Sequence, residues 1–192
     1  WSVVLDRVSG LWMLCAIGGL GAAACAPQLA PALRLPSGVF VTLMLGGTAL
    51  WLLLPLALPW LLRRGRIGWL APLHTAMGRS DFHAQLLRQA IASAAVQVLS
   101  AAALAAGGLA LGVHISWAAW AFAIAPVFLM AALPASVGGW GTREAAAVVA
   151  LAPFGVSAAA AVGTGVVYGL YQLVQGAMGA LAFGLPGRGR TG

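Results

Sequence analysis

Apolar residues fill most of the chain in long runs, and short stretches with polar residues, glycine or proline separate these runs. A helix of about 20 apolar residues is long enough to cross a hydrocarbon core about 30 Å thick. The runs that predict helices cover residues 10–26, 39–62, 86–111, 117–133, 143–152 and 157–183. The pattern therefore predicts an all-α, polytopic transmembrane helical bundle, with about five to six membrane helices in this chain.

Small residues and prolines indicate where these helices approach one another and where they end. The first run contains Gly18, Gly19 and Gly21, and glycines let neighbouring helices approach closely in membranes. The prolines that follow predict a short loop at residues 27–36, which holds Arg34. We therefore expect close helix packing around the first run and a break in helical structure after it.

The strongest break in the apolar pattern lies at residues 133–144, which read Leu-Pro-Ala-Ser-Val-Gly-Gly-Trp-Gly-Thr-Arg-Glu. Glycine adopts backbone angles closed to other residues, so a helix is not expected to continue through this segment. Thr142 is the predicted N-cap of a helix that begins at Arg143, with Glu144 in its first turn, where an acid suits the helix dipole. Because that helix is only about 15 Å long, we expect a re-entrant hairpin at residues 134–154. Two full crossings are the alternative.

Composition and charge place the protein in a membrane. The chain of 192 residues is 62% hydrophobic and only 7% charged, with a mean hydropathy of +0.98, whereas soluble domains carry about a quarter charged residues. All ten basic residues are arginine. Because most lie in short loops, they indicate topology and contact with anionic lipid headgroups, not a nucleic-acid surface. The positive-inside rule places the basic loop at residues 63–83 and the C-terminus in the cytoplasm of a multi-pass cell-membrane protein.

Residues suited to catalysis or metal binding are few. Cys15 and Cys25 share one apolar run without Cys-x-x-Cys spacing and are expected to be buried. His74, His83 and His114 lie at loops or helix ends and do not cluster in the sequence. No Walker-type loop is present. The sequence therefore predicts no metal site, no cofactor and no enzyme activity in this chain.

Two motifs, in this order, resemble those of a known family. Residues 5–11 read Leu-Asp-Arg-Val-Ser-Gly-Leu, and residues 134–144 read Pro-x-Ser-x-Gly-Gly-x-Gly-x-Arg-Glu. With the alanine-rich short helix and the last span rich in glycine and tyrosine, they resemble the lysylphosphatidylglycerol synthase transmembrane region, a flippase-like family. Members usually begin with further spans, so we interpret residues 1–192 as a single transmembrane domain, the C-terminal part of a longer protein.

The resemblance implies a protein that moves lipids with polar or sugar-bearing headgroups across the bilayer. Its partner would be a membrane lipid, either an anionic phospholipid or a polyprenyl-phosphate-linked sugar. The alternative is an accessory subunit or scaffold of a membrane lipid-modifying enzyme or glycosyltransferase, which the arginine loop would recruit. A homo-oligomer is compatible with both interpretations.

The second motif supplies the candidate lipid-binding residues. A helix N-terminus beside an arginine forms a site for an anion such as a phosphate. Arg143 can pair bidentately with phosphate oxygens, and Glu144 could hold Arg143 in place or bind a cationic headgroup. The remaining candidates supply hydrogen bonds or room for the phosphate: Ser136, Gly138, Gly139, Gly141 and Thr142.

Other polar residues in apolar surroundings suggest further contacts. Asp6 and Arg7 are candidate ion-pair partners, because Arg143 with Asp6 and Glu144 with Arg7 could lock two helices together. The candidates to line the same cavity as the motif, all in the last span, are Tyr168, Tyr171, Gln172 and Gln175.

Two helical faces carry small or polar residues at a spacing that brings them together. In the run at 86–111, one face contains Ser93, Gln97 and Ser100. In the run at 157–183, a face of small residues contains Gly165, Gly169, Gly176 and Ala180. We expect the second face to serve helix packing.

Overall fold

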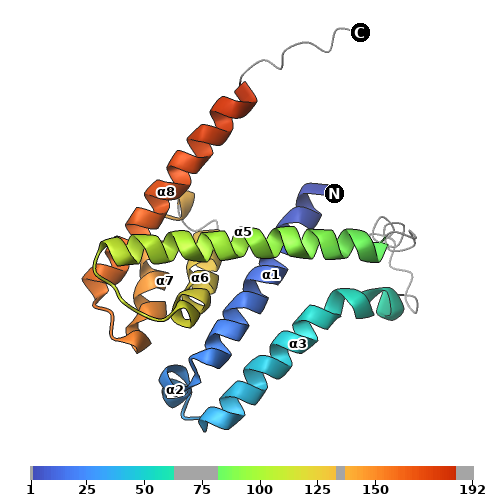
Figure 1. Cartoon of the computed structure of the whole chain (residues 1–192), viewed down its shortest axis with the longest axis horizontal. Helices are drawn as coiled ribbons and strands as arrows, with labels where there is room; N and C mark the ends of the chain where they lie inside the picture. Colours follow the sequence, from blue (N-terminus) through green and yellow to red (C-terminus); the bar gives the residue numbers. More distant parts are fainter. Residues whose placement is uncertain (1, 63–81, 133–136, 185–192) are drawn as a thin grey trace.

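The computed structural model describes residues 2–62, 82–132 and 137–184 (Figure 1). This part of the chain is helical and contains no strand, so the prediction of an all-α bundle is confirmed. The α-helices are α1 (Ser2–Ala24), α2 (Ala26–Leu29), α3 (Ser37–Leu62), α5 (Phe82–Ala110), α6 (Trp117–Ala132), α7 (Thr142–Leu151) and α8 (Ala158–Gly184). In the same ranges, 3-10 turns lie at Ala30–Leu33, Val137–Gly139 and Ala152–Phe154. Most of the predicted basic loop, residues 63–83, lies outside these ranges.

Apolar helices long enough to cross a membrane occur in the described part of the chain. They are α3, over Ser37–Ala57, and α5; Val8–Ala24 and Ala26–Leu33, which meet at 80°, form a third if counted as one bent span. α6 has 16 residues and α7 has 10, so they are about 24 Å and about 15 Å long. Neither alone crosses a hydrocarbon core of about 30 Å. By length and composition, the described residues therefore hold two helices able to cross a membrane, or three with the bent pair, which is consistent with the predicted helical membrane bundle.

The segment after α1 is more helical than predicted. Residues 27–36 were expected to form a loop, but α2 and a 3-10 turn occupy most of this segment. Pro27 lies in the first turn of α2, where its missing N–H breaks no helical hydrogen bond. The helical structure ends at Arg34, which adopts a left-handed conformation with a φ of 55°. The prolines thus permit short helical turns here and redirect the chain between α1 and α3.

The glycines of α1 lie where neighbouring helices come closest. A Cβ atom at Gly21 would lie 2.5 Å from the backbone nitrogen of Phe122 in α6, and one at Gly18 would lie 2.6 Å from the Cβ of Ala125. On another side of α1, Gly19 faces the hydroxyl of Thr48 in α3. The predicted close packing around this run is therefore confirmed.

Two tryptophans join α1 to α3. The indole N–H of Trp12 donates to the backbone carbonyl of Trp51 at 2.8 Å, and that of Trp51 donates to the carbonyl of Trp12 at 2.9 Å. Each residue is thus both donor and acceptor in the same pair. The sequence alone did not predict this reciprocal pair.

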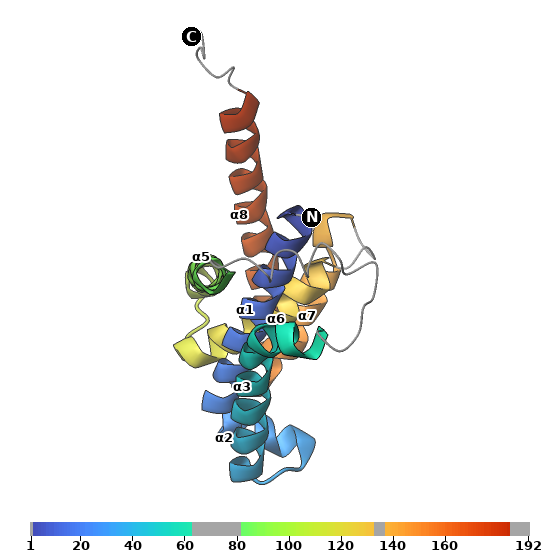
Figure 2. The ribbon, with the colours of Figure 1, turned by 90° about the vertical axis from the view of Figure 1, so that its right-hand side faces the viewer.

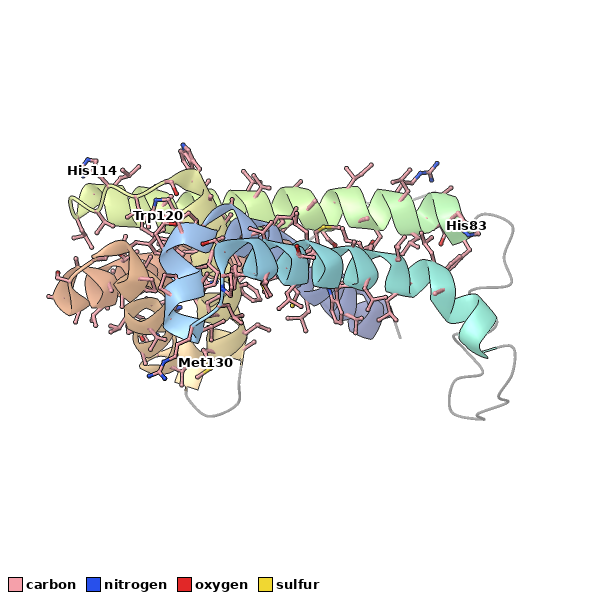
Figure 3. The ribbon with its side chains drawn as sticks, turned by 90° about the horizontal axis from the view of Figure 1, so that it is seen from below. His83, His114, Trp120 and Met130 are labelled. Carbon is pink, nitrogen blue, oxygen red and sulfur yellow. The ribbon has the colours of Figure 1, made fainter. Side chains whose placement is uncertain are left out.

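A core of buried apolar residues joins α1, α5, α6, α7 and α8. Figure 2 looks along α5 and shows that it runs crosswise to α1 and α8. Trp120 of α6 is buried in this core, and a Cβ atom at Gly108 of α5 would overlap its ring (Figure 3). α8 begins in the core, and its second half projects from the bundle (Figure 1). α7 packs against both α6 and α8.

Candidate functional site

Glycines shape the backbone that leads into α7. Gly138, Gly139 and Gly141 have φ values of +63°, +78° and +84°, in the left-handed region that glycine adopts without strain. A Cβ atom at Gly139 would also lie 2.9 Å from the carbonyl oxygen of Ala131 in α6. Only glycine fits so close an approach in this conformation. The predicted break between the two helices is therefore confirmed, and it turns the chain from α6 into α7.

α7 begins one residue earlier than predicted, at Thr142. Gly141 occupies the N-cap position, and its backbone N–H donates a hydrogen bond to Glu144 Oε2. The Thr142 hydroxyl donates to the carbonyl oxygen of Gly139 at 3.1 Å. The prediction of Thr142 as the N-cap is therefore wrong. The Glu144 carboxylate reaches back to the helix start, as in a capping box, and the hydroxyl is used to close the preceding turn.

The Arg143 side chain lies inside the bundle, with only 1% of its surface exposed. Its Nε donates to Glu144 Oε1 at 3.3 Å, and its Nη1 donates to Gln172 Oε1 at 3.0 Å. The guanidinium carbon lies 5.0 Å from the ring centroid of Trp140, in cation–π contact. Nη2 is buried and has no hydrogen-bond partner among the described residues. The guanidinium therefore keeps unused donors in a buried position.

Two glycines of α8, one helical turn apart, make room for this charged pair. A Cβ atom at Gly169 would overlap the guanidinium of Arg143, and one at Gly165 would lie 3.2 Å from Glu144 Cα. Farther along the same predicted face, Gly176 has no described atom within 4 Å of such a Cβ. The small-residue face therefore packs against α7 in its first half, while its second half is exposed.

Four residues of α8 were predicted to line a common cavity. In the structure, two of them face the bundle and two are exposed. Gln172 contacts Arg143 directly. Tyr168 is buried, and its ring stacks on that of Tyr171 with the centroids 6.5 Å apart. Tyr171 and Gln175 are exposed. Of the two glutamines, Gln172 is thus the one that the fold brings to the motif.

Three further predicted residues lie outside the part of the structure that can be compared. Ser136 falls outside the described residues, as do the side chains of Asp6 and Arg7, whose backbone belongs to α1. The ion pairs of Arg143 with Asp6 and of Glu144 with Arg7 therefore stay predictions. Among the described side chains, the acidic partner of Arg143 is Glu144.

The contacts of Arg143 satisfy its charge only in part. The carboxylate of Glu144 accepts one guanidinium N–H at 3.3 Å, which is longer than the distance of about 2.7–2.9 Å typical of charge-assisted hydrogen bonds. Desolvation of an ion costs several kcal/mol, and only good geometry with every donor bonded offsets that cost. The ring of Trp140, which is 39% exposed, lies against the guanidinium. The site is therefore a buried, incompletely bonded cation in contact with an indole ring.

The histidines and cysteines of the described residues do not join this site. His83 and His114 lie near opposite ends of α5 (Figure 3), and no cluster of three potential metal ligands occurs in the described ranges. Cys25 is buried and Cys15 partly buried, and both are free thiols. The groups that meet at the start of α7 are thus a guanidinium, a carboxylate, an amide and an indole.

A family match covers most of the chain, including both sequence motifs. The family described as the Lysylphosphatidylglycerol synthase TM region matches residues 1–179. The chain belongs to this family. Neither a curated protein nor a solved structure is significantly similar to it. Membership of the lysylphosphatidylglycerol synthase TM family and the apolar helices α3 and α5 identify a membrane protein related to lipid-modifying proteins.

Sequence reasoning missed two neighbours of Arg143. Trp140 lies within the motif, and its position three residues before Arg143 was the one available signal. Gly169 was assigned to helix packing alone, although the guanidinium occupies the space beside it. No local signal marks that contact, because it depends on where α8 crosses α7.

Proposed function

We propose that the protein binds a phospholipid or a lipid-linked sugar and moves it across the cell membrane. The observation that carries this proposal is the buried guanidinium of Arg143, whose Nη2 has no partner among the described residues. Taking an ion out of water costs several kcal/mol even inside a protein. Charged residues within membrane segments are rare and usually functional. An anionic headgroup is the ligand that would use the free donors.

A phosphate would bond Arg143 more completely than its present partners do. Two phosphate oxygens can accept from Nη1 and Nη2 in parallel, whereas Glu144 accepts from Nε alone. In this proposal the phosphate replaces Gln172 at Nη1 and fills the vacant position at Nη2. Glu144 keeps its bonds to Nε and to the start of α7, and so holds the guanidinium in place. A cationic group on the same headgroup would lie near the Glu144 carboxylate.

Arg143 would meet a headgroup only after α7 and α8 separate. Gly165 and Gly169 form the α8 side of this contact. Opening this contact would break the Arg143–Gln172 hydrogen bond and the close packing at Gly165 and Gly169, and contacts with the bound headgroup would replace them. Trp140 would have to move as well, because its ring lies over the guanidinium. The described conformation would then be an occluded state, in which Glu144 and Gln172 hold Arg143 between transport events.

The proposed orientation follows the positive-inside rule. The basic loop at residues 63–83 would face the cytoplasm, together with Arg188 and Arg190 near the end of the chain. Translocation of this kind assigns no covalent step and no cofactor to the chain. The lipid is the partner that the proposal requires.

The test is transbilayer movement of a labelled phosphoglycolipid in vesicles that contain the reconstituted full-length protein. Arg143→Ala should slow this movement about tenfold or more, because a hydrogen bond to a charged group contributes about 1.5–3 kcal/mol. Arg88→Ala is the matched control, since Arg88 is exposed near the start of α5. The rate of this control should equal that of the wild type. Arg143→Lys, which keeps the charge but loses the planar fork, should give an intermediate rate.

Equal rates for Arg143→Ala and the wild type would contradict the role of Arg143. If folded wild-type protein moves the lipid no faster than protein-free vesicles do, translocation itself is wrong. That second result would favour the alternative, an accessory subunit or scaffold of a lipid-modifying enzyme or glycosyltransferase.

A further inference from the structure

A second polar region lies in a groove between α1, α5 and α6. The groove has a volume of about 330 Å³, at the lower end of the range of about 300–1,000 Å³ that is typical of ligand pockets. Gly10 and Leu11 of α1 line one side, Ser93 and Gln97 of α5 another, and Phe128 of α6 a third. The volume suits one small headgroup unit rather than a whole lipid.

Gln97 is the residue of this groove that has an unpaired polar atom. Its side chain is only 4% exposed, and its Nε2 donates to the backbone carbonyl of Gly10 at 3.2 Å. Its Oε1 is buried and has no hydrogen-bond partner in the described part of the chain. Native proteins rarely leave a buried amide oxygen unpaired unless a ligand or water completes it. Gln97 is among the residues that line the groove, and a rotation of its side-chain amide would present this buried oxygen to a donor bound there.

Hydroxyl groups extend the polar wall beyond Gln97. Ser93 is buried, and its Oγ lies 3.3 Å from Oγ of Ser9. Gln89 donates from Nε2 to the same Ser9 oxygen at 2.9 Å. Ser9 and Gly10 belong to the motif at residues 5–11, to which the proposed translocation assigned no role. This motif therefore meets the polar face of α5 at the groove.

The chemistry of the lining favours an uncharged ligand that bears hydroxyl groups. The described residues of the lining carry amide, hydroxyl and backbone polar groups. Among these described residues, no side chain carries a charge that would balance a phosphate. Leu11 and Phe128 add apolar surface, against which the C–H groups of a sugar or glycerol can pack. An acyl chain would leave Gln97 Oε1 unpaired, and a site with unpaired polar groups discriminates strongly against such a ligand.

We propose that this groove is a binding subsite for the neutral polyol part of a lipid headgroup, a sugar or glycerol unit that donates a hydroxyl to Gln97 Oε1. The subsite rests on the proposed lipid-binding function and deepens it, because it names the headgroup chemistry. Its residues lie on α1, α5 and α6, whereas the partners of Arg143 lie on α7, on α8 and in the turn before α7.

The test compares two lipids that differ only in the hydroxyl groups of the headgroup. One is a diacylglycerol with a glucosyl ring, and the other carries a tetrahydropyranyl ring of the same size. Binding of each lipid to the full-length protein is titrated in a detergent without sugar groups, because a glycoside detergent would compete. The wild type should bind the glucosyl lipid about tenfold more tightly, since the bound hydroxyls complete buried hydrogen bonds. Gln97→Leu should remove this preference.

Gln175→Leu is the matched control, because it makes the same replacement at an exposed position of α8. It should keep the preference. Gln97→Met, an unbranched replacement, serves as the second variant if the leucine variant does not fold. A wild type that binds both lipids equally would overturn the subsite and leave the groove to water alone. Retention of the preference in the Gln97 variants would overturn the role of Gln97.

Binding and movement separate this subsite from the proposed function. A preference for the glucosyl lipid without any lipid movement would support the subsite and contradict translocation. Movement that depends on Arg143 without a preference between the two lipids would support translocation and contradict the subsite.

Discussion

The guanidinium of Arg143 occupies the space that a side chain at position 169 would need. Gly169 therefore belongs to the site, although it carries no functional group. Glu144 also acts through more than its charge: one carboxylate oxygen accepts from the N–H of Gly141, and the other accepts from Arg143. The same residue thus positions the start of α7 and orients the cation.

Substitution of Gly169 tests this arrangement. Gly169→Ala should lower the free energy of unfolding by about 1–3 kcal/mol, because the added methyl group must displace the guanidinium. Gly176→Ala adds the same group where no described atom lies within 4 Å, and alanine is the better helix former by about 0.8–1 kcal/mol. The control should therefore be as stable as the wild type or more so. Thermal unfolding in detergent measures both, and equal losses would contradict the close contact between Gly169 and Arg143.

At the scale of helices, glycines let α1 approach both neighbouring helices, and a pair of tryptophans adds hydrogen bonds on the α3 side. Gly18 and Gly21 let it approach the backbone of α6. Trp12 and Trp51 connect it to α3 through two reciprocal hydrogen bonds. The glycine contacts depend on a close fit between helices. The two tryptophan hydrogen bonds instead connect α1 and α3 at one point. The position of α1 matters for the proposed polyol subsite, because Gly10 and Leu11 of this helix line the groove.

Removal of the indole N–H groups should weaken the α1–α3 contact. Trp12→Phe and Trp51→Phe should each lower the free energy of unfolding by about 1 kcal/mol, the net contribution of a typical hydrogen bond, together with some loss of packing. Trp117→Phe is the control, because Trp117 is 69% exposed, and it should change stability by less than about 0.5 kcal/mol. The measurement is again thermal unfolding in detergent. A loss for Trp117→Phe as large as for the other two would contradict the reciprocal pair.

The described part of the molecule presents many large apolar side chains outward. Leu50 of α3, Leu99 of α5 and Leu181 of α8 are among the exposed leucines. Soluble monomers rarely expose contiguous apolar patches of large area, whereas a bilayer accepts such a surface. The polar groups with unsatisfied bonds, Gln97 and Arg143, lie instead among the buried residues. Apolar side chains thus cover the outer surface and unpaired polar groups lie inside, as expected for a membrane bundle with polar sites in its interior.

A charge on this outer surface should therefore block insertion. Leu99→Arg places a cation at a position that is 68% exposed in the long apolar helix α5, at an expected cost of about 2.5–3.5 kcal/mol. His114→Arg makes a similar change in the loop after α5 and should be tolerated. The amount of folded protein in the membrane fraction measures both. Normal insertion of Leu99→Arg would contradict a lipid-facing position for this side of α5.

The sequence by itself determined the helical class, the positions of the long helices and the break before α7. These features depend on local properties, namely the length of apolar runs and the conformations of glycine and proline. The run predicted at 39–62 is α3, Ser37–Leu62, and that at 117–133 is α6, Trp117–Ala132. The two errors also concern local structure. Short helical turns, not a loop, occupy most of residues 27–36 despite the prolines. The carboxylate of Glu144, not the hydroxyl of Thr142, bonds the start of α7.

Only the tertiary structure decided which faces meet. Gln172 reaches Arg143 across 29 residues, and Gln97 reaches Gly10 across 87. Gln172 and Gln175 are three residues apart in one helix, yet one bonds the cation and the other is exposed. Composition cannot separate them, because the crossing of α7 and α8 determines which side of α8 is covered. Local sequence sets where helices form, and the packing of distant helices against one another sets which polar groups share a site.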